Sequence, residues 1–102
     1  EMPEFDGGAK GLMKYVGQNI VYPSVAREIG IEGIVYVSFV VNETGNVENA
    51  KVIKGIGYGC DEEVIRVVSK MPRWKKIGKN AGHPVKVRFN IPVSFKLRWT
   101  SL

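Results

Sequence analysis

The sequence has few of the residues that build disulfides, metal sites or membrane spans. Its 102 residues include one cysteine and one histidine, so no internal disulfide can form. No run approaches the roughly 18 apolar residues of a membrane helix, and the acidic start EMPE is unlike a signal peptide. With 44% hydrophobic and 25% charged residues, the composition is that of a globular chain. We therefore expect one soluble domain, with any anchor or targeting segment outside this sequence.

The net charge of +5 is unevenly distributed along the chain. Residues 1–50 hold three Lys and Arg against seven Asp and Glu, which gives −4. Residues 51–102 hold twelve against three, which gives +9. This asymmetry indicates either a surface for an anionic partner or the solvated side of a strand and a loop, and the sequence supports both about equally.

The spacing of apolar residues predicts three helices. The first covers about residues 9–19. Pro23 suits the first turn of a short second helix that ends at Gly30. The third helix opens at Asp61 with three acids at its positive end, and it ends at Met71 because a proline follows. The apolar residues of the second helix are Val25, Ala26 and Ile29.

Three strands are predicted from β-branched and alternating segments. Residues 34–43 form the first, and a turn with Gly45 leads into a second at 47–54, whose apolar phase slips between Val47 and Ala50 and indicates a bulge. A long alternation then starts at Pro84. Its core face holds Val85, Val87, Phe89, Ile91, Val93, Phe95 and Leu97, and its other face holds Lys86, Arg88, Asn90, Pro92, Ser94, Lys96 and Arg98. Because the aromatic residues share the core face, an RNA-binding sheet is disfavoured and we expect no nucleic-acid partner.

This order of elements predicts an α+β fold: a three-stranded antiparallel sheet with two to three helices on one face and water on the other. Pro92 lacks the N–H that a strand ladder needs, so the last strand is predicted to be a sheet edge. One hypothesis is that this edge binds an extended peptide by strand addition. The alternative, slightly favoured by sequence alone, is that Pro92 and the cations Lys86, Arg88 and Lys96 protect the edge from aggregation.

The sequence contains no convincing catalytic or cofactor-binding constellation. His83 has no second histidine to form a metal site and is interpreted as a surface loop residue. Cys60 precedes three carboxylates that oppose a thiolate, so we expect a small buried side chain. Trp74 is predicted to fill the core, whereas Trp99 cannot be assigned. We expect neither an enzyme, a cofactor nor a metal.

Seven short motifs follow one another along the chain: Tyr22-Pro23, Ile31-Glu32-Gly33, Val35-x-Val37-x-Phe39-x-Val41, Gly45-x-Val47, Asp61-Glu62-Glu63, Met71-Pro72-x-Trp74 and Pro84-Val85-x-Val87-x-Phe89. Together they resemble the C-terminal domain of TonB, the periplasmic energy transducer. The motifs span Tyr22 to Leu97, preceded by a lead-in over residues 1–21, within a single domain over residues 1–102. One departure is Ile77-Gly78, where many relatives have Pro-Gly. The resemblance therefore does not predict the shape of the loop from Lys75 to His83.

The resemblance implies a helix-covered three-stranded antiparallel sheet and a role in protein binding. TonB domains grip the TonB box, a short extended segment of outer-membrane receptors, and transmit force from a proton-driven complex in the inner membrane. The box adds alongside the last strand, here Val85 to Leu97, with further contacts just before the Tyr-Pro pair. The implied partner-binding residues are Gln18, Asn19, Ile20, Val21, Val85, Lys86, Val87, Arg88, Phe89, Asn90, Ile91 and Ser94.

The resemblance also implies a location and leaves the parent protein open. We expect the domain to lie in the periplasm of a Gram-negative cell, tethered to the inner membrane by a segment outside this sequence. A TonB-like recognition domain on a membrane sensor, peptidase-like protein or scaffold is the alternative. An exposed edge strand permits either a monomer or a strand-exchanged homodimer.

Overall fold

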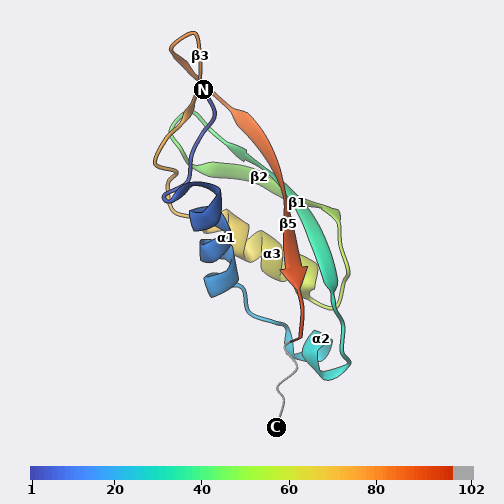
Figure 1. Cartoon of the computed structure of the whole chain (residues 1–102). Helices are drawn as coiled ribbons and strands as arrows, with labels where there is room; N and C mark the ends of the chain where they lie inside the picture. The colour runs from blue at the N-terminus through green and yellow to red at the C-terminus, as the bar shows by residue number, and fades with distance from the viewer. Residues whose placement is uncertain (98–102) are drawn as a thin grey trace.

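The computed structural model describes residues 1–97 as an elongated molecule of 54 × 26 × 16 Å (Figure 1). Three helices and five strands follow the order α1, α2, β1, β2, α3, β3, β4, β5. Their bounds are α1 Gly8–Asn19, α2 Ser24–Glu28, β1 Gly33–Val41, β2 Val47–Lys54, α3 Cys60–Ser69, β3 Gly78–Asn80, β4 His83–Val85 and β5 Val87–Phe95. Arg98, predicted on the open face of the last strand, and Trp99, which the sequence left unassigned, lie outside the described residues.

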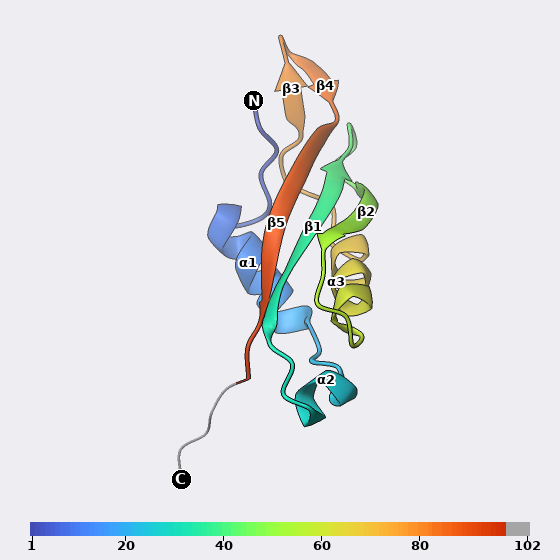
Figure 2. The same cartoon turned by 90° about the vertical axis from the view of Figure 1, so that its right-hand side faces the viewer.

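The main sheet has three antiparallel strands in the order β2-β1-β5. β1 is central, and its pairing with β5 is regular from Gly33 opposite Phe95 to Val41 opposite Val87. In the view of Figure 2, α1 and α3 lie behind this sheet, so the predicted α+β architecture is confirmed. α2 lies at one end of the molecule instead of on the helix-covered face.

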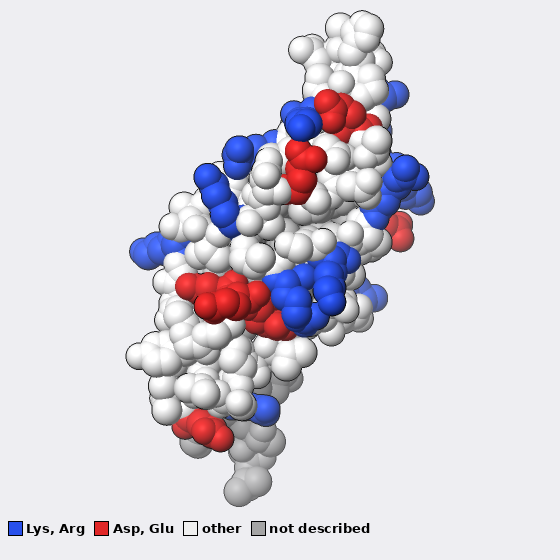
Figure 3. Space-filling model, turned by 180° about the vertical axis from the view of Figure 1, so that it is seen from behind, with Lys and Arg blue, Asp and Glu red and all other residues white. Residues whose placement is uncertain are grey.

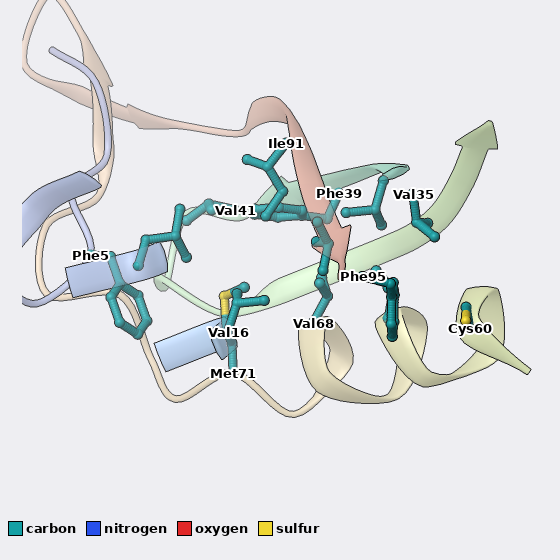
Figure 4. Close-up of a cluster of buried hydrophobic side chains, with 14 of the residues drawn as sticks. Phe5, Val16, Val35, Phe39, Val41, Cys60, Val68, Met71, Ile91 and Phe95 are labelled. Carbon is teal, nitrogen blue, oxygen red and sulfur yellow. The ribbon is translucent and has the colours of Figure 1, made fainter. Parts of the chain in front are cut away.

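The core fills the space between the sheet and the two longer helices (Figure 4). β1 contributes four side chains with no exposed surface, and they are the alternate residues that the sequence assigns to its core face. These residues are Val35, Val37, Phe39 and Val41. α3 presents Val64, Val67 and Val68 to them, at the spacing of one helix face. An amphipathic helix and an alternating strand therefore bury complementary faces, as their sequence periods require.

β2 contains the predicted bulge. Ser38 pairs with Lys51 whereas Val40 pairs with Glu48, so β2 has one extra residue in this interval. Asn49 takes a left-handed φ of 56°, a conformation that asparagine tolerates better than most residues. A second irregularity lies between Tyr36 and Val37. The outer edge of β2 is therefore distorted, whereas β5 is regular along its length.

The prediction of one long strand from Pro84 is wrong. β4 pairs with β3 in a separate two-stranded hairpin, and β5 begins at Val87 after a break at Lys86. The turn consists of Ala81 and Gly82 with φ of 52° and 83°, the two positive values of a tight hairpin turn. The alternation of side chains continues across the break, which is why sequence periodicity does not reveal it.

Two smaller helix expectations also need correction. Val25 and Ile29 of the expected apolar face are 56% and 58% exposed, and only Ala26 of α2 is buried. A helix of five residues at the end of the molecule has too little neighbouring structure to cover a full apolar face. α3 ends at Ser69, two residues before Met71, and Lys70 caps it.

Candidate peptide-binding edge

β5 forms one edge of the main sheet, as Pro92 predicts. Within residues 1–97, β1 is the only strand that pairs with it. Pro92 lies opposite Tyr36 and has no N–H, so this pair cannot be one that exchanges two backbone hydrogen bonds. Because such pairs alternate along an antiparallel ladder, the backbone groups of Arg88, Asn90 and Ser94 face the open edge with Pro92. The edge therefore offers the N–H donors of these three residues, with a gap at Pro92 between Asn90 and Ser94.

The predicted site residues of the last strand divide into three groups. Arg88, Asn90 and Ser94 are exposed and lie on the edge. Val87, Phe89 and Ile91 belong to the same strand, but they turn toward the core, and Ile91 is 8% exposed. The remaining two predicted residues, Val85 and Lys86, precede β5, and Val85 pairs with Gly78 in the β3–β4 hairpin.

The cations at the start of β5 reach back across the sheet. Lys86 Nζ donates to Glu48 Oε1 at 2.9 Å, and Arg88 Nη1 donates to Ser38 Oγ at 2.9 Å. Hydrogen bonds from Lys86 and Asn42 lower the pKa of Glu48, and the bond to Glu48 raises the pKa of Lys86. Val40, on the same open face, is only 6% exposed. These cations thus lie over β1 and β2 and leave the backbone of the β5 edge accessible.

The second predicted contact region, Gln18 to Val21, includes the end of α1 and the start of the following linker. Val21 N donates to Glu63 Oε2 at 2.7 Å. Arg66 binds both carboxylate oxygens of Glu63, at 2.8 and 2.7 Å, and also donates to the carbonyl of Asn19 at 3.2 Å. The bonds from Arg66 are the main cause that lowers the pKa of Glu63. α3 therefore holds this linker through one ion pair.

The linker lies near the C-terminal end of β5. The ring of Tyr22, the next residue along, meets the ring of Phe95 edge-on with centroids 5.4 Å apart. The Tyr22 hydroxyl donates to the carbonyl of Ile31, and burial is the main cause that raises its pKa. The two predicted contact regions are thus brought together at one end of the edge strand.

An apolar groove lies at the other end of the edge. It has a volume of about 410 Å³ and is open to solvent along one side. Phe89, Ile91 and Trp74 contribute one wall, and Met2, Leu12 and Met13 contribute to the other. In Figure 2, the N-terminal segment and α1 lie beside β5 on the side away from β1, and residues of both line the groove.

The packing beneath this groove is aromatic. Phe5 meets Trp74 edge-on with ring centroids 5.5 Å apart, and Trp74 in turn lies 5.0 Å from Phe89. Trp74 is 3% exposed, which confirms its predicted core position. Its indole Nε1 is buried without an acceptor among the described residues. The N-terminal segment is therefore held by the same aromatic cluster that supports β5.

Sequence comparison assigns the chain to a family. The family model for the Gram-negative bacterial TonB protein C-terminal matches residues 18–97. The chain belongs to this TonB C-terminal family. No curated protein sequence matches it.

Two solution structures of the Helicobacter pylori TonB C-terminal domain share the fold. One, of its residues 194–285, has a TM-score of 0.66 and 23% identity over 89% of this chain and 95% of that chain. The other, of its residues 179–285, has a TM-score of 0.64 and 23% identity over 87% of this chain and 79% of that chain. Both contact regions predicted from the TonB resemblance fall within the family match, whereas the N-terminal wall of the groove precedes it.

Two features of this TonB-type domain were not foreseen in the sequence. The acids of α3 were interpreted as ordinary helix-start residues, but Glu63 also holds Val21 and Asp61 accepts backbone bonds from Ile56 and Gly57. The groove was not predicted, because Met13 stands at the helical spacing of the apolar residues of α1 and is nevertheless 44% exposed. The spacing of apolar residues along α1 does not show that Met13 lies at the rim of the groove.

The two other residues that the sequence analysis considered for chemistry, Cys60 and His83, differ in their burial. Cys60 is fully buried, and burial, followed by Asp61 and Glu62, raises the pKa of its thiol. His83 is exposed in β4. No group of His, Cys, Asp and Glu among residues 1–97 could hold a metal ion. No helix in the same range is long and apolar enough to span a membrane.

Proposed function

We propose that this TonB-family domain binds the TonB box of an outer-membrane receptor by adding it as a fourth strand at the open edge of β5. The observation that carries the proposal is the regular, unpaired edge of β5 within the described chain. Main-chain hydrogen bonds to that edge supply affinity, and side chains on either side of the added strand supply selectivity.

The two edges of the sheet support β5 as the binding edge. β2 is bulged at Asn49 and irregular near Ile53, which disrupts the spacing of its backbone donors and acceptors. β5 has nine residues in continuous register with β1. At about 3.4 Å per residue, it offers a template of roughly 30 Å for an extended peptide. The linker Gln18 to Val21 adds a contact at one end of this template.

The wider role follows from the same proposal. Linked to the inner membrane through a segment outside this sequence, the domain would transmit force from the proton-driven complex to the receptor in the periplasm. A strand bound along its length suits this role, because force along the strand loads several backbone hydrogen bonds together. The domain acts as a protein-binding module and not as an enzyme.

The test is an amide NMR titration of the domain with TonB-box peptides from receptors of the source organism. We expect the largest shifts at Arg88, Asn90 and Ser94 and in the linker Gln18 to Val21. Lys51 and Lys54 of β2 serve as internal controls that should remain unchanged. A folded sample that binds no box peptide at millimolar concentration contradicts the proposal and favours recognition of another ligand by a sensor or scaffold protein.

A further inference from the structure

We propose that the apolar groove beside β5 holds an apolar side chain of the added strand, so that the N-terminal segment helps to select the partner. The inference rests on the proposed function and goes beyond it, because residues 1–17 lie outside the family match at 18–97. The occupant is an extended peptide whose side chain at the groove is apolar.

The pleat of the sheet determines which side chains of an added strand reach the groove. In β5, Phe89 and Ile91 turn toward the helix-covered side and form part of the groove wall. A neighbouring strand continues the same pleat, so every second side chain of that strand also turns to this side. Beside Phe89 and Ile91, such a side chain meets the N-terminal segment and α1 instead of solvent.

The chemistry of the wall favours an apolar occupant. Met2 and Met13 are 62% and 44% exposed, although each is large and hydrophobic. Methionine side chains are flexible and polarizable, and they adapt to different apolar ligands. The volume of about 410 Å³ lies within the range of roughly 300 to 1,000 Å³ typical of ligand pockets. A side chain placed there removes both its own surface and that of the methionines from water.

The two charged residues of the groove are joined through their backbones. Glu4 N donates to the carbonyl of Lys76 at 2.9 Å, and Lys76 N donates to the carbonyl of Glu4 at 3.1 Å. This pair ties the N-terminal segment to the chain leading into β3 and keeps the wall in place.

The three methionines allow the groove to be observed directly. Met2 and Met13 line it, whereas Met71 is 8% exposed in the core and does not. In a domain carrying ¹³C-methyl methionine, a bound TonB-box peptide should shift the methyl signals of Met2 and Met13 and leave that of Met71 in place. The amide signals of Arg88, Asn90 and Ser94 report strand addition in the same sample.

A filled groove supplies the second arm of the test. Ala9 is exposed on α1 and lines the groove, so Ala9→Trp places a large ring in it. Ser69→Trp is the matched control, because Ser69 is an exposed helical residue outside the groove. We expect Ala9→Trp to weaken peptide binding about tenfold, the loss that accompanies one large apolar contact, and Ser69→Trp to change it less than twofold. Alanine substitution along the peptide identifies the position that occupies the groove. At that apolar position, alanine should weaken binding to the wild-type domain but should not weaken binding to Ala9→Trp any further.

The two arms separate failure of the groove from failure of the binding edge. Shifts at the β5 amides without shifts at Met2 and Met13, and equal affinity of Ala9→Trp and Ser69→Trp, overturn the groove proposal and leave strand addition standing. Shifts at neither set mean that the box peptide does not bind, which overturns the proposed function. Methyl shifts that grow with protein concentration in the absence of peptide would assign the groove to a second copy of the chain and also overturn the proposal.

Discussion

Glu63 joins two parts of the chain that are 42 residues apart, because its carboxylate accepts the backbone N–H of Val21 as well as the guanidinium of Arg66. Its side chain is 13% exposed and that of Arg66 is 45% exposed, so these bonds lie at the surface and are only partly shielded from water. We predict that Glu63→Gln lowers the free energy of unfolding by about 1 to 3 kcal/mol, the usual cost of losing charge-assisted hydrogen bonds. Urea unfolding at pH 7 measures the loss.

The pH dependence distinguishes this role from a general helix effect. The pKa of Glu63 is lowered in the folded domain, so its contribution is complete above the unfolded pKa of about 4.3 and is lost as the pH falls through the folded value. The difference between wild type and Glu63→Gln should therefore shrink below about pH 4. Glu62→Gln is the control, since Glu62 is exposed in the same helical turn. An equal loss in both variants would assign the effect to the helix dipole.

Substitution by alanine should have opposite effects at two glycines of α1, Gly11 and Gly17. A Cβ at Gly11 would collide with the carbonyl oxygen of Asp6, whereas a Cβ at Gly17 would meet nothing within 4 Å. Gly17→Ala should stabilise the domain by about 0.5 to 1 kcal/mol through helix propensity. Gly11→Ala should destabilise it by about 1 to 3 kcal/mol, because the backbone of the N-terminal segment must shift. Thermal unfolding compares them, and stabilisation by both would mean that this segment moves freely on α1.

For β5 as an element, one proline substitution tests the direction in which its backbone groups point. Pro92 already occupies an edge position, and Asn90 lies two residues away with its N–H on the same side. Asn90→Pro should weaken box-peptide binding about tenfold, because one backbone hydrogen bond is lost, while unfolding changes little. Asn90→Thr keeps the N–H and should bind like wild type. If Asn90→Pro instead unfolds the domain, the N–H of Asn90 pairs with β1 and does not face the open edge.

Strong periodicity made most elements predictable. β1 is a run of β-branched and aromatic residues, and α1 and α3 repeat apolar residues at helical spacing, so their types and approximate bounds follow from local sequence. The β3–β4 hairpin does not follow, because Ala81 adopts a left-handed conformation that its residue type does not announce. The division between β4 and β5 was missed because the alternation continues across Lys86.

The candidate site was predictable only in part. Pro92 identified the edge, since the missing N–H is a property of the residue itself. The bond from Val21 to Glu63 and the groove near Met2 and Met13 depend on how distant segments pack. No spacing rule along the chain encodes such contacts. Edge position was therefore accessible from sequence, whereas the surroundings of the edge were not.

For the whole molecule, the charges that divide unevenly along the sequence become mixed in space. The acidic first half supplies Glu48 and the basic second half supplies Lys86, and the two residues form an ion pair at 2.9 Å. Figure 3 shows acidic and basic clusters side by side on one face, instead of a continuous basic surface. The net charge of +5 nevertheless gives every copy of the domain the same sign.

This charge and the form of the edge predict the oligomeric state. Two copies paired through β5 would join their three-stranded sheets through a strand-to-strand ladder. Pairing would also bring Arg88 and Lys96 of each copy near those of the other, and like charges facing each other across strands are destabilising. We therefore predict that the domain is a monomer of 11.3 kDa at a protein concentration of about 0.1 mM.

Sedimentation velocity at low and high salt checks this prediction. A monomer under both conditions agrees with an edge that is kept free for a peptide. A dimer that forms only at high salt would show that charge repulsion alone keeps the copies apart. A dimer already present at low salt contradicts the prediction. If Asn90→Pro then abolished that dimer, the β5 edge would be its interface, and a box peptide would have to displace the second copy before it could bind.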